Sequence, residues 1–345
     1  MKAKDKCNKG ITLVALVITI IILLILATIS IQALTQTGLF QKANEAKEKM
    51  QNAEENQAKI LNEYEDELNK YISGNVKIPE KIIDVEQGAE SHISGVISYS
   101  WIELSAIAQK ISDNVDISSN TAEVNVTLNG TVKSLGVGDI ATVDGKTVRI
   151  LGFNHDLLTD INAYGSATAT GTAGISFEYL DFAMQYSQQM NTIDDNTNGW
   201  AAMPLRTALN ETVYDSLSIK DYIKAVNKEY IITNNTVTKL ICSDKLWLLS
   251  CGEIWDNGYN GGNTRGYAEM SEGNQYKYFK STLGSTPYNT STSITKKNND
   301  SGSYYWWLRS PYGNHDKGFC IVDKDGYCNI NNANISIGVT PGFSI

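Results

Sequence analysis

An uncharged apolar run close to the N-terminus is the strongest feature of the hydropathy pattern. It extends from Ile11 to Ala27 and follows a leader that contains four lysines. A run of about 20 apolar residues is long enough to cross a bilayer as a helix. Because the lysines precede the run, the leader is expected in the cytoplasm and the remainder outside. We therefore predict a transmembrane segment at residues 11–32 and a single-pass protein of the cell membrane with an extracellular C-terminal domain.

The polar stretch that follows has a helical period. Between Leu39 and Ile72 there is neither Gly nor Pro, and apolar residues recur at intervals of three and four. This spacing predicts an amphipathic helix with one modest apolar stripe. We predict a stalk helix over residues 33–74, which Ser73-Gly74-Asn75 ends. A coiled coil would show the same pattern, and either structure would act as a spacer.

The segment from residue 75 to residue 130 carries weaker signals and is interpreted as a small linking region. Ser100–Ser112 has the pattern of a short helix. Residues 123–128 alternate between polar and apolar side chains, and the Asn129-Gly130 pair after them predicts a hairpin turn. A second pair of this kind, Asp144-Gly145, joins further alternating stretches at residues 140–143 and 147–151.

From residue 131 to residue 345 the chain is rich in Gly, Asn, Ser, Thr and Tyr, and its periodic segments are short. Few helices, many short strands and long polar loops predict an α+β domain. The predicted fold class is therefore α+β, with a long transmembrane and stalk helix ahead of that domain. The predicted helices are residues 177–189, 204–210 and 219–226, and the predicted strands are residues 245–249, 306–308, 319–322 and 339–343.

Charge and composition limit the classes of partner and cofactor. Charged residues make up 19% of the chain and hydrophobic residues 42%, which is typical of a globular protein. The formal net charge is −9. Because binding to a phosphate backbone needs a basic face, we predict no nucleic-acid partner. The three histidines are far apart in the sequence and lack metal-ligand spacing, so we predict neither a metal nor another cofactor.

Four cysteines follow the apolar run, on the predicted extracellular side, where disulfides persist. They are Cys242, Cys251, Cys320 and Cys328. Their pairing cannot be read from the sequence. If Asp325-Gly326 forms a two-residue hairpin turn, Cys320 and Cys328 face opposite sides of the sheet, and no bond between them is expected.

Motifs for catalysis are absent from the sequence. It contains no Walker A loop, HExxH, nucleophile elbow or Cys-x-x-Cys. His155-Asp156 has the chemistry of an acid–base pair, but no neighbouring residue completes a site. Glu253 and Asp256 flank Trp255 in a segment that we interpret as a surface loop. No group of residues supports an active site, and we predict that the protein is not an enzyme.

The dipeptide Lys9-Gly10 precedes the apolar run, whereas an ordinary secretory signal has its cleavage site after the run. This arrangement resembles the class III leader of type IV pilins and pseudopilins, with residues 1–10 as the leader. The resemblance implies cleavage between Gly10 and Ile11 by a prepilin peptidase, and other pilin-like subunits as partners in a surface filament. These families usually carry a glutamate where this chain has Ala15, so anchoring is a firmer expectation than assembly. A simple N-terminal anchor is the alternative.

Several motifs in the C-terminal half also point to a known family. They are Met203–Asn210 (MPLRTALN), Asp244–Ser250 (DKLWLLS), Trp306–Pro311 (WWLRSP) and Gly338–Phe343 (GVTPGF). Over residues 131–345 they resemble a domain family of undefined function that is common on Gram-positive bacterial surfaces. That family is similar to the C-type-lectin-like fold shared with formylglycine-generating enzymes, which implies a C-type-lectin-like binding domain. Thr340 replaces the arginine that members usually have, and the cysteine pattern of the enzymes is not recognisable, which argues against enzymatic activity.

The block between the last two of these motifs has an unusual composition. Its polar and isoleucine residues are those that mutations of the adenines in an AAC codon produce from asparagine. This resembles the variable region of proteins diversified by diversity-generating retroelements, whose targets commonly have a C-type-lectin-like fold. The resemblance implies that fixed apolar residues form the core while the asparagine-derived residues face a ligand. These ligand-binding candidates are Asn314, His315, Asp316, Tyr327, Asn329, Asn331, Asn332 and Asn334. An Asn-rich polar loop surface is the alternative.

The combined prediction is a pilin-like, membrane-anchored surface protein that displays a domain for adhesion or recognition. Its ligand, a protein or a glycan on another surface, is not identified by the sequence. Tyr and Asn suit such a face, because Tyr provides rigid contact area and Asn provides adaptable hydrogen bonds. Two alternatives remain open: a surface enzyme related to formylglycine-generating proteins, and a minor pseudopilin with a structural role.

Overall fold

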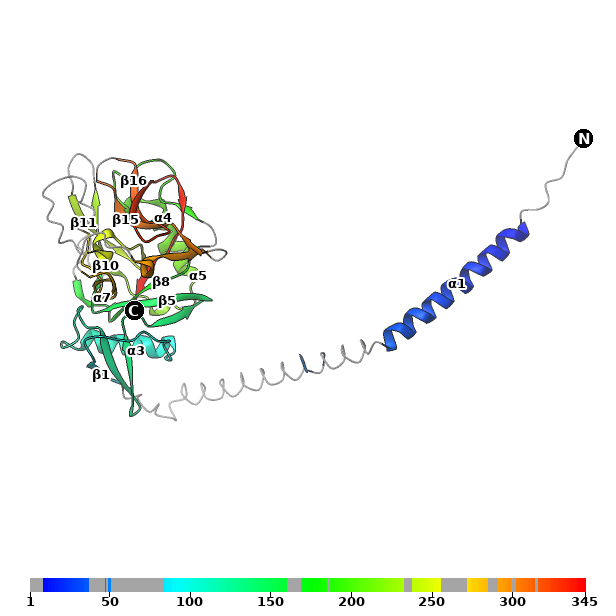
Figure 1. Ribbon diagram of the computed structural model, residues 1–345, viewed down its shortest axis with the longest axis horizontal. Helices are drawn as coiled ribbons and strands as arrows, with labels where there is room; N and C mark the ends of the chain where they lie inside the picture. The colour runs from blue at the N-terminus through cyan, green and yellow to red at the C-terminus, as the bar shows by residue number, and fades with distance from the viewer. Residues whose placement is uncertain are drawn as a thin grey trace, which may run out of the picture. The chain divides into compact units, whose positions relative to one another are not determined.

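The computed structural model describes residues 9–36, 47, 49–50, 83–159, 169–184, 187–232, 238–255, 272–284, 291–298, 302–313 and 316–345. The chain divides into two compact units, Met1–Glu80 and Lys81–Ile345 (Figure 1). Each unit is described by itself.

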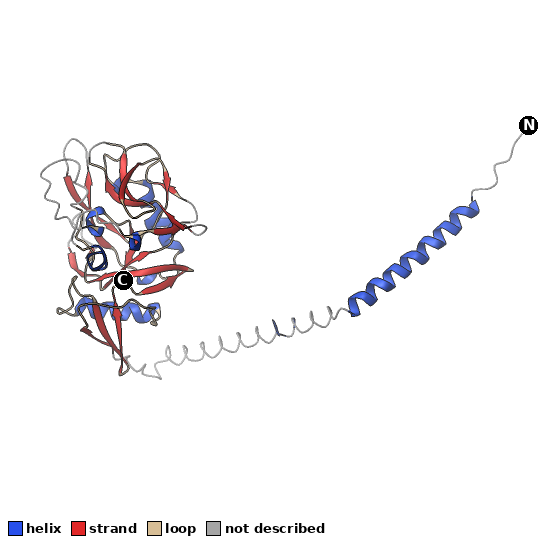
Figure 2. Cartoon of the chain, in the orientation of Figure 1, coloured by secondary structure: helices blue, strands red, loops and turns tan. Residues whose placement is uncertain are grey.

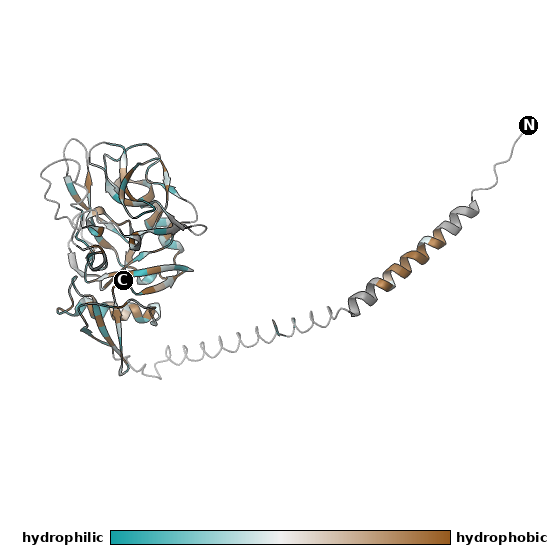
Figure 3. Cartoon of the chain, in the orientation of Figure 1, coloured by the Kyte–Doolittle hydropathy of each residue, from teal (hydrophilic) through white to brown (hydrophobic). Residues whose placement is uncertain are grey.

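The first unit contains helix α1 (Lys9–Gln36). Its side chains are described over residues 16–29, where apolar residues such as Leu23 and Leu24 are exposed. The brown part of α1 in Figure 3 marks this hydrophobic stretch. Among the described residues, no helix has the length and apolar character that a membrane crossing requires. The predicted transmembrane segment at residues 11–32 is therefore wrong, as are the membrane and surface-filament localisations deduced from it.

Strands dominate the second unit, as the red arrows in Figure 2 show. Strand accounts for 37% and helix for 27% of the structure. The predicted α+β class is therefore wrong, and the fold is mainly β. The physical reason is that the segments rich in Gly, Asn, Ser and Thr are poor helix formers, so the helices there are short.

A small antiparallel sheet opens the second unit, with strand order β1-β2-β3. Its strands are β1 (Ile83–Gln87), β2 (Glu123–Leu128) and β3 (Thr131–Gly136). Helix α3 (Trp101–Asp113) begins with a capping box between Ser100 and Glu103 and buries one apolar face. The predicted helix at residues 100–112 and the Asn129-Gly130 turn are both confirmed, and both turn residues have positive φ.

His92 connects this sheet to the segment that leads into the next one. Its Nδ1 lies 2.6 Å from Glu123 Oε2 and its Nε2 lies 2.8 Å from Asp139 Oδ1. Burial lowers the pKa of His92, but the hydrogen bonds and charges of the two carboxylates outweigh this effect and raise it above 6.5. These two contacts of His92 therefore hold β2 against residue 139.

The central sheet has five antiparallel strands in the order β12-β19-β8-β5-β4. They are β4 (Ile140–Val143), β5 (Lys146–Phe153), β8 (Ile175–Tyr179), β12 (Leu246–Trp247) and β19 (Gly342–Ser344). The predicted Asp144-Gly145 turn between β4 and β5 is confirmed. Strand β19 lies between β12 and β8, so the C-terminal residues are part of the core of the unit.

The second unit also contains a four-stranded sheet in the order β11-β10-β6-β7. Two strand pairs, β13-β14 and β9-β18, lie in the same unit. The strands are β6 (Leu157–Thr159), β7 (Ala169–Thr172), β9 (Gln188–Gln189), β10 (Val226–Ile232), β11 (Thr238–Asp244), β13 (Lys296–Asn298), β14 (Gly302–Tyr304) and β18 (Ser336–Ile337). The short helices are η1 (Trp200–Ala202), α4 (Pro204–Ala208), η2 (Leu209–Val213), α5 (Tyr214–Ser216), η3 (Lys220–Tyr222), α6 (Cys251–Ile254), α7 (Lys277–Leu283) and η5 (Thr292–Ile294).

The last sheet, β15-β16-β17, lies between two apolar cores. Its strands are β15 (Trp306–Pro311), β16 (Gly318–Val322) and β17 (Cys328–Asn332). Because side chains alternate along a strand, Trp306 and Leu308 belong to one core and Trp307 to the other. Both tryptophans are fully buried. The strands predicted at residues 306–308 and 319–322 are confirmed.

Three local predictions have different outcomes. The helix predicted at residues 204–210 is confirmed by α4, which continues into η2. The helix predicted at residues 177–189 is wrong, because Phe177 pairs with Phe343 in the central sheet. The helix predicted at residues 219–226 is reduced to the single turn η3, since strand β10 begins at Val226.

Candidate functional site

The predicted ligand-binding residues lie on and around strand β17, with two exceptions. Asn314 and His315 lie outside the described residues. The exposed members are Asp316, Tyr327, Asn329 and Asn332, and the half-buried members are Asn331 and Asn334. Strand β17, the outer strand of its sheet, carries three of them, Asn329, Asn331 and Asn332.

The strand distributes these residues over its two faces. Asn329 and Asn331 share one face, because successive side chains alternate. Asn332 lies on the other face, where its Nδ2 donates to Asp194 Oδ2 at 3.0 Å. The structure therefore places the described candidates on and around one edge strand without gathering them on one face.

The asparagines cap the outer edge of β17. Along an antiparallel edge strand, alternate N–H groups point away from the partner strand. In β17 the Ile330 N–H donates to Asn329 Oδ1 at 2.8 Å, and the Asn332 N–H donates to Asn331 Oδ1 at 2.9 Å. An uncapped edge would be open to pairing with another chain, so these side chains also protect the strand.

The turn between β16 and β17 sets the register of the hairpin. The Asp323 N–H donates to the Tyr327 carbonyl at 2.9 Å, which encloses a three-residue loop that ends at Gly326, with φ of 85°. The predicted two-residue turn at Asp325-Gly326 is therefore wrong. This change of one residue in register places Cys320 and Cys328 on the same face of the sheet, contrary to the prediction.

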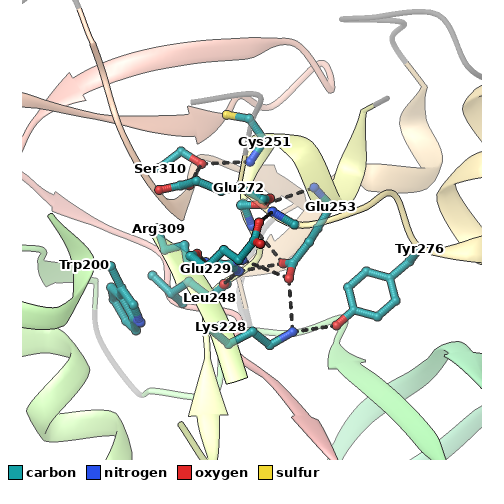
Figure 4. A network of polar contacts seen from close by, with 12 residues as sticks. Trp200, Lys228, Glu229, Leu248, Cys251, Glu253, Glu272, Tyr276, Arg309 and Ser310 are labelled. Atoms are coloured by element: carbon teal, nitrogen blue, oxygen red, sulfur yellow. Dashed lines mark hydrogen bonds and ion pairs between the residues drawn. The ribbon is translucent and has the colours of Figure 1, made fainter. Parts of the chain in front are cut away.

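Beneath this edge, β15 and β16 are buried along their whole length. Arg309 of β15 forms a bidentate pair with Glu253 of α6, at 2.6 and 2.9 Å (Figure 4). Its guanidinium also donates to the carbonyls of Leu248 and Glu229 at 2.7 and 2.8 Å. This arrangement ties β15 to β10, to α6 and to the chain after β12.

A second buried cation extends the same network. Lys228 of β10 donates to Glu253 Oε1 at 3.1 Å and to the Tyr276 hydroxyl at 2.8 Å (Figure 4). It also donates to Asp156 Oδ1 at 2.6 Å. Its Nζ also lies 3.4 Å from the centre of the Trp247 ring, in a cation–π contact. Lys228 therefore joins residues that are far apart in the sequence.

The electrostatics of the network follow from burial and pairing. Burial opposes ionisation of Asp156 and Glu253, but Lys228 and Arg309 outweigh it and hold the pKa of both carboxyls below its usual range. Glu272 differs, because burial dominates and raises its pKa to about 8. The Glu272 carboxyl accepts hydrogen bonds from the Ser310 hydroxyl and, at 2.7 Å, from the Ile231 N–H.

The charged groups of this network face one another, so its chemistry is that of a scaffold. A groove of about 250 Å³ lies elsewhere, lined by residues of α3, β7 and the C-terminus such as Ser105, Thr172 and Ile345. Paired buried charges hold elements in place but offer no group to a substrate. The exposed edge of β17 and its turn are therefore the candidate site, and the network is their support.

Sequence reasoning missed this network. The prediction that Glu253 lies in a surface loop is wrong, since its residue is only 2% exposed. The pattern Ser250-x-x-Glu253 is a capping box and could have indicated helix α6. Lys228, the buried cation that pairs with Asp156, is 72 residues away in the sequence, and no local pattern could have identified it.

Comparison with known proteins gives one match. The model of a family described as "Domain of unknown function (DUF6273)" matches residues 170–345. No curated protein and no solved structure matches the chain. These findings include no pilin, C-type lectin or retroelement-diversified protein, and we withdraw those assignments. Gly10 and Ile11 lie at the start of α1, and cleavage between them stays a prediction.

Proposed function

The chain belongs to the DUF6273 family, and we propose that its C-terminal domain is a recognition module that binds another protein along strand β17. The proposed module binds without catalysing a reaction. One observation carries the proposal: an exposed, polar edge strand is fixed to two strands that are entirely buried. Binding residues on a rigid scaffold lose little conformational entropy when a ligand arrives.

The orientation of two asparagines supports binding at this edge. A backbone N–H requires an acceptor, so the Oδ1 atoms of Asn329 and Asn331 must face their own strand. The Nδ2 end of each amide then points away from that N–H. The strand thus presents two oriented hydrogen-bond donors, which suit the carbonyl oxygens of a polypeptide.

Exposed apolar side chains along β17 and near its two ends favour a protein ligand over a glycan. Tyr327 is 55% exposed, Ile330 38% and Ile335 45%. Large apolar side chains surrounded by polar ones are typical of protein interfaces, where the apolar groups anchor and the polar groups orient. Asp316 adds an exposed carboxylate near the same edge.

The test uses the full chain and peptides selected on it from a random peptide library. In the double variant Asn329→Asp/Asn331→Asp, a carboxylate oxygen still accepts each backbone N–H, but both Nδ2 donors are lost. A net hydrogen bond is worth about 0.5–1.5 kcal/mol, so we expect peptide affinity to fall roughly 5- to 100-fold with the fold intact. Fluorescence anisotropy of labelled peptides measures this change.

Asn120→Asp is the matched control, because Asn120 is exposed and distant in sequence and undergoes the same chemical change. It should leave affinity unchanged. If the peptides bind the double variant with the same affinity as the unchanged chain, the proposed binding site along β17 is refuted. If the chain selects no peptide but binds sugars on a glycan array, then the ligand is a glycan and the proposed protein ligand is wrong.

A further inference from the structure

Three cysteines from three different elements meet inside the second unit. Cys251 is the first residue of α6, Cys320 lies in β16 and Cys328 is the first residue of β17. Their Sγ atoms all lie within 4.8 Å of one another. The Cys251 and Cys328 sulfurs are 4.0 Å apart.

The hairpin register creates this cluster. Cys320 pairs with Ile330 and Val322 pairs with Cys328, so both cysteines lie on one face of the sheet as diagonal neighbours. Cys251 reaches the same face from α6, whose position is fixed by the pair between Glu253 and Arg309. The three thiols are therefore held by elements that the buried network already fixes.

The surroundings of the thiols are apolar. Cys251 and Cys320 are buried in the same apolar core as Trp306, Leu308 and Val322, and half-buried Cys328 packs against that core. Burial raises the pKa of Cys251. The pKa of Cys320 is also raised, mainly by its hydrogen bonds with the other two thiols and to a lesser degree by burial. Such thiols stay protonated until a cation displaces their protons, as a coordinating metal does.

We propose that Cys251, Cys320 and Cys328 bind one soft metal ion through three thiolates. An ion about 2.3 Å from each sulfur would separate the sulfurs by roughly 3.8–4.0 Å. The Cys251 and Cys328 sulfurs already have this separation, and all three sulfurs lie within 4.8 Å of one another. Three thiols release three protons as the ion enters, and no electron is transferred. The inference is independent of recognition at the edge of β17.

The ligand set restricts the choice of ion. Thiolates select soft or borderline ions such as Cu⁺ and Zn²⁺ and disfavour Mg²⁺ and Ca²⁺. Cu⁺ is satisfied by three sulfurs, whereas Zn²⁺ prefers four ligands and would add a water. Within the described part of the chain, the three cysteines form a metal-ligating group without a His, Asp or Glu. The site would link the β16–β17 hairpin to α6.

The test is titration of the reduced full chain, under anaerobic conditions, with Cu⁺ and with Zn²⁺ in separate arms. A chromophoric chelator competes for the ion and reports affinity and stoichiometry. We expect one ion per chain in at least one arm and a rise in the thermal midpoint. Cu⁺ should also produce ultraviolet thiolate-to-metal absorption. Cys251→Ser, Cys320→Ser and Cys328→Ser should each weaken binding by about tenfold or more.

Cys242→Ser is the matched control. This thiol is half-buried, donates towards the Lys228 carbonyl and lies outside the cluster, so the variant should bind like the unchanged chain. Near-ultraviolet circular dichroism of each metal-free variant shows whether the variant is still folded, so that loss of a metal ligand can be distinguished from unfolding. Because Cys328 is only half-buried, its substitution is expected to disturb the fold least. A reduced chain that binds neither ion would overturn the proposal, as would undiminished binding by a folded Cys328→Ser variant. Peptide mapping that finds a disulfide between two of the three cysteines in the isolated protein would also overturn it.

Discussion

Adjacent residues in this protein have separate structural roles because strand geometry sends them in opposite directions. Trp306 and Trp307 are both fully buried, but they pack into different apolar cores. The Trp306 indole donates to the Ile294 carbonyl at 3.1 Å and the Trp307 indole to the Gln188 carbonyl at 2.8 Å. Each tryptophan therefore anchors a different part of the chain to β15.

At the same scale, Glu272 should make stability depend on pH. Its pKa is about 8 in the folded protein and 4.5 when exposed, so the folded state holds a proton that the unfolded state has lost. Stability from this group is complete below pH 4.5 and declines as pH rises towards about 8, by at most about 1.4 kcal/mol per pH unit. Glu272→Gln should remove this decline in denaturant unfolding measured across that range.

A control separates this effect from the titration of other groups. Glu90 is exposed, and Glu90→Gln should leave the pH dependence of the unchanged protein in place. If Glu272→Gln also keeps the original slope, then ionisation of Glu272 does not couple to folding.

At the scale of elements, the β16–β17 hairpin depends on one glycine. Gly326 has φ of 85°, and a Cβ there would collide with the carbonyl oxygen of Ser291. Gly145, in the β4–β5 turn, has φ of 78° with no heavy atom within 4 Å of the corresponding position. The two turns therefore have the same backbone demand but different surroundings.

These surroundings predict unequal costs for the same substitution. Gly145→Ala should lower the free energy of unfolding by about 1–2 kcal/mol, the cost of holding an alanine in a left-handed conformation. Gly326→Ala has the same conformational cost, and its Cβ must also displace Ser291. We therefore expect its free energy of unfolding, measured by chemical denaturation, to fall by more than about 2 kcal/mol. Equal losses in the two variants would show that the contact with Ser291 yields easily.

At the scale of the whole molecule, the folding unit is larger than the part that the family model matches. That match begins at residue 170, whereas the buried apolar side chains of the described residues begin at Val85. Strand β5 lies between β8 and β4 in the central sheet. Arg149 of this strand pairs with buried Glu178 of β8, which also contacts buried Lys296.

A comparison of two fragments tests this boundary. Residues 81–345 contain the full second unit and should unfold cooperatively with a thermal midpoint close to that of the full chain. Residues 170–345 lack β4, β5 and Arg149, and removing one partner of a buried pair typically costs about 3–5 kcal/mol. We expect this shorter fragment to show no cooperative transition by circular dichroism. A cooperative transition would mean that the matched region folds without β5.

The sequence by itself determined the features whose causes are local. The Asn129-Gly130 and Asp144-Gly145 turns and the short helix from Ser100 were predicted, because a few neighbouring residues decide the backbone there. The short strands around Trp307 and Ile321 could also be predicted from their apolar character. Hydropathy alone was misleading at the N-terminus, since the described part of α1 does not meet the requirements of a membrane span.

Only the tertiary structure decided which distant residues meet. Lys228 and Asp156 pair across 72 positions, and nothing in the sequence near either residue identifies its partner. The faces of Cys320 and Cys328 depended on one residue of hairpin register, which the hydrogen bond between Asp323 and Tyr327 sets. The physical reason is that turns and caps gain their free energy from neighbouring residues, whereas buried ion pairs, sheet order and register gain theirs from contacts that form only when the whole core packs.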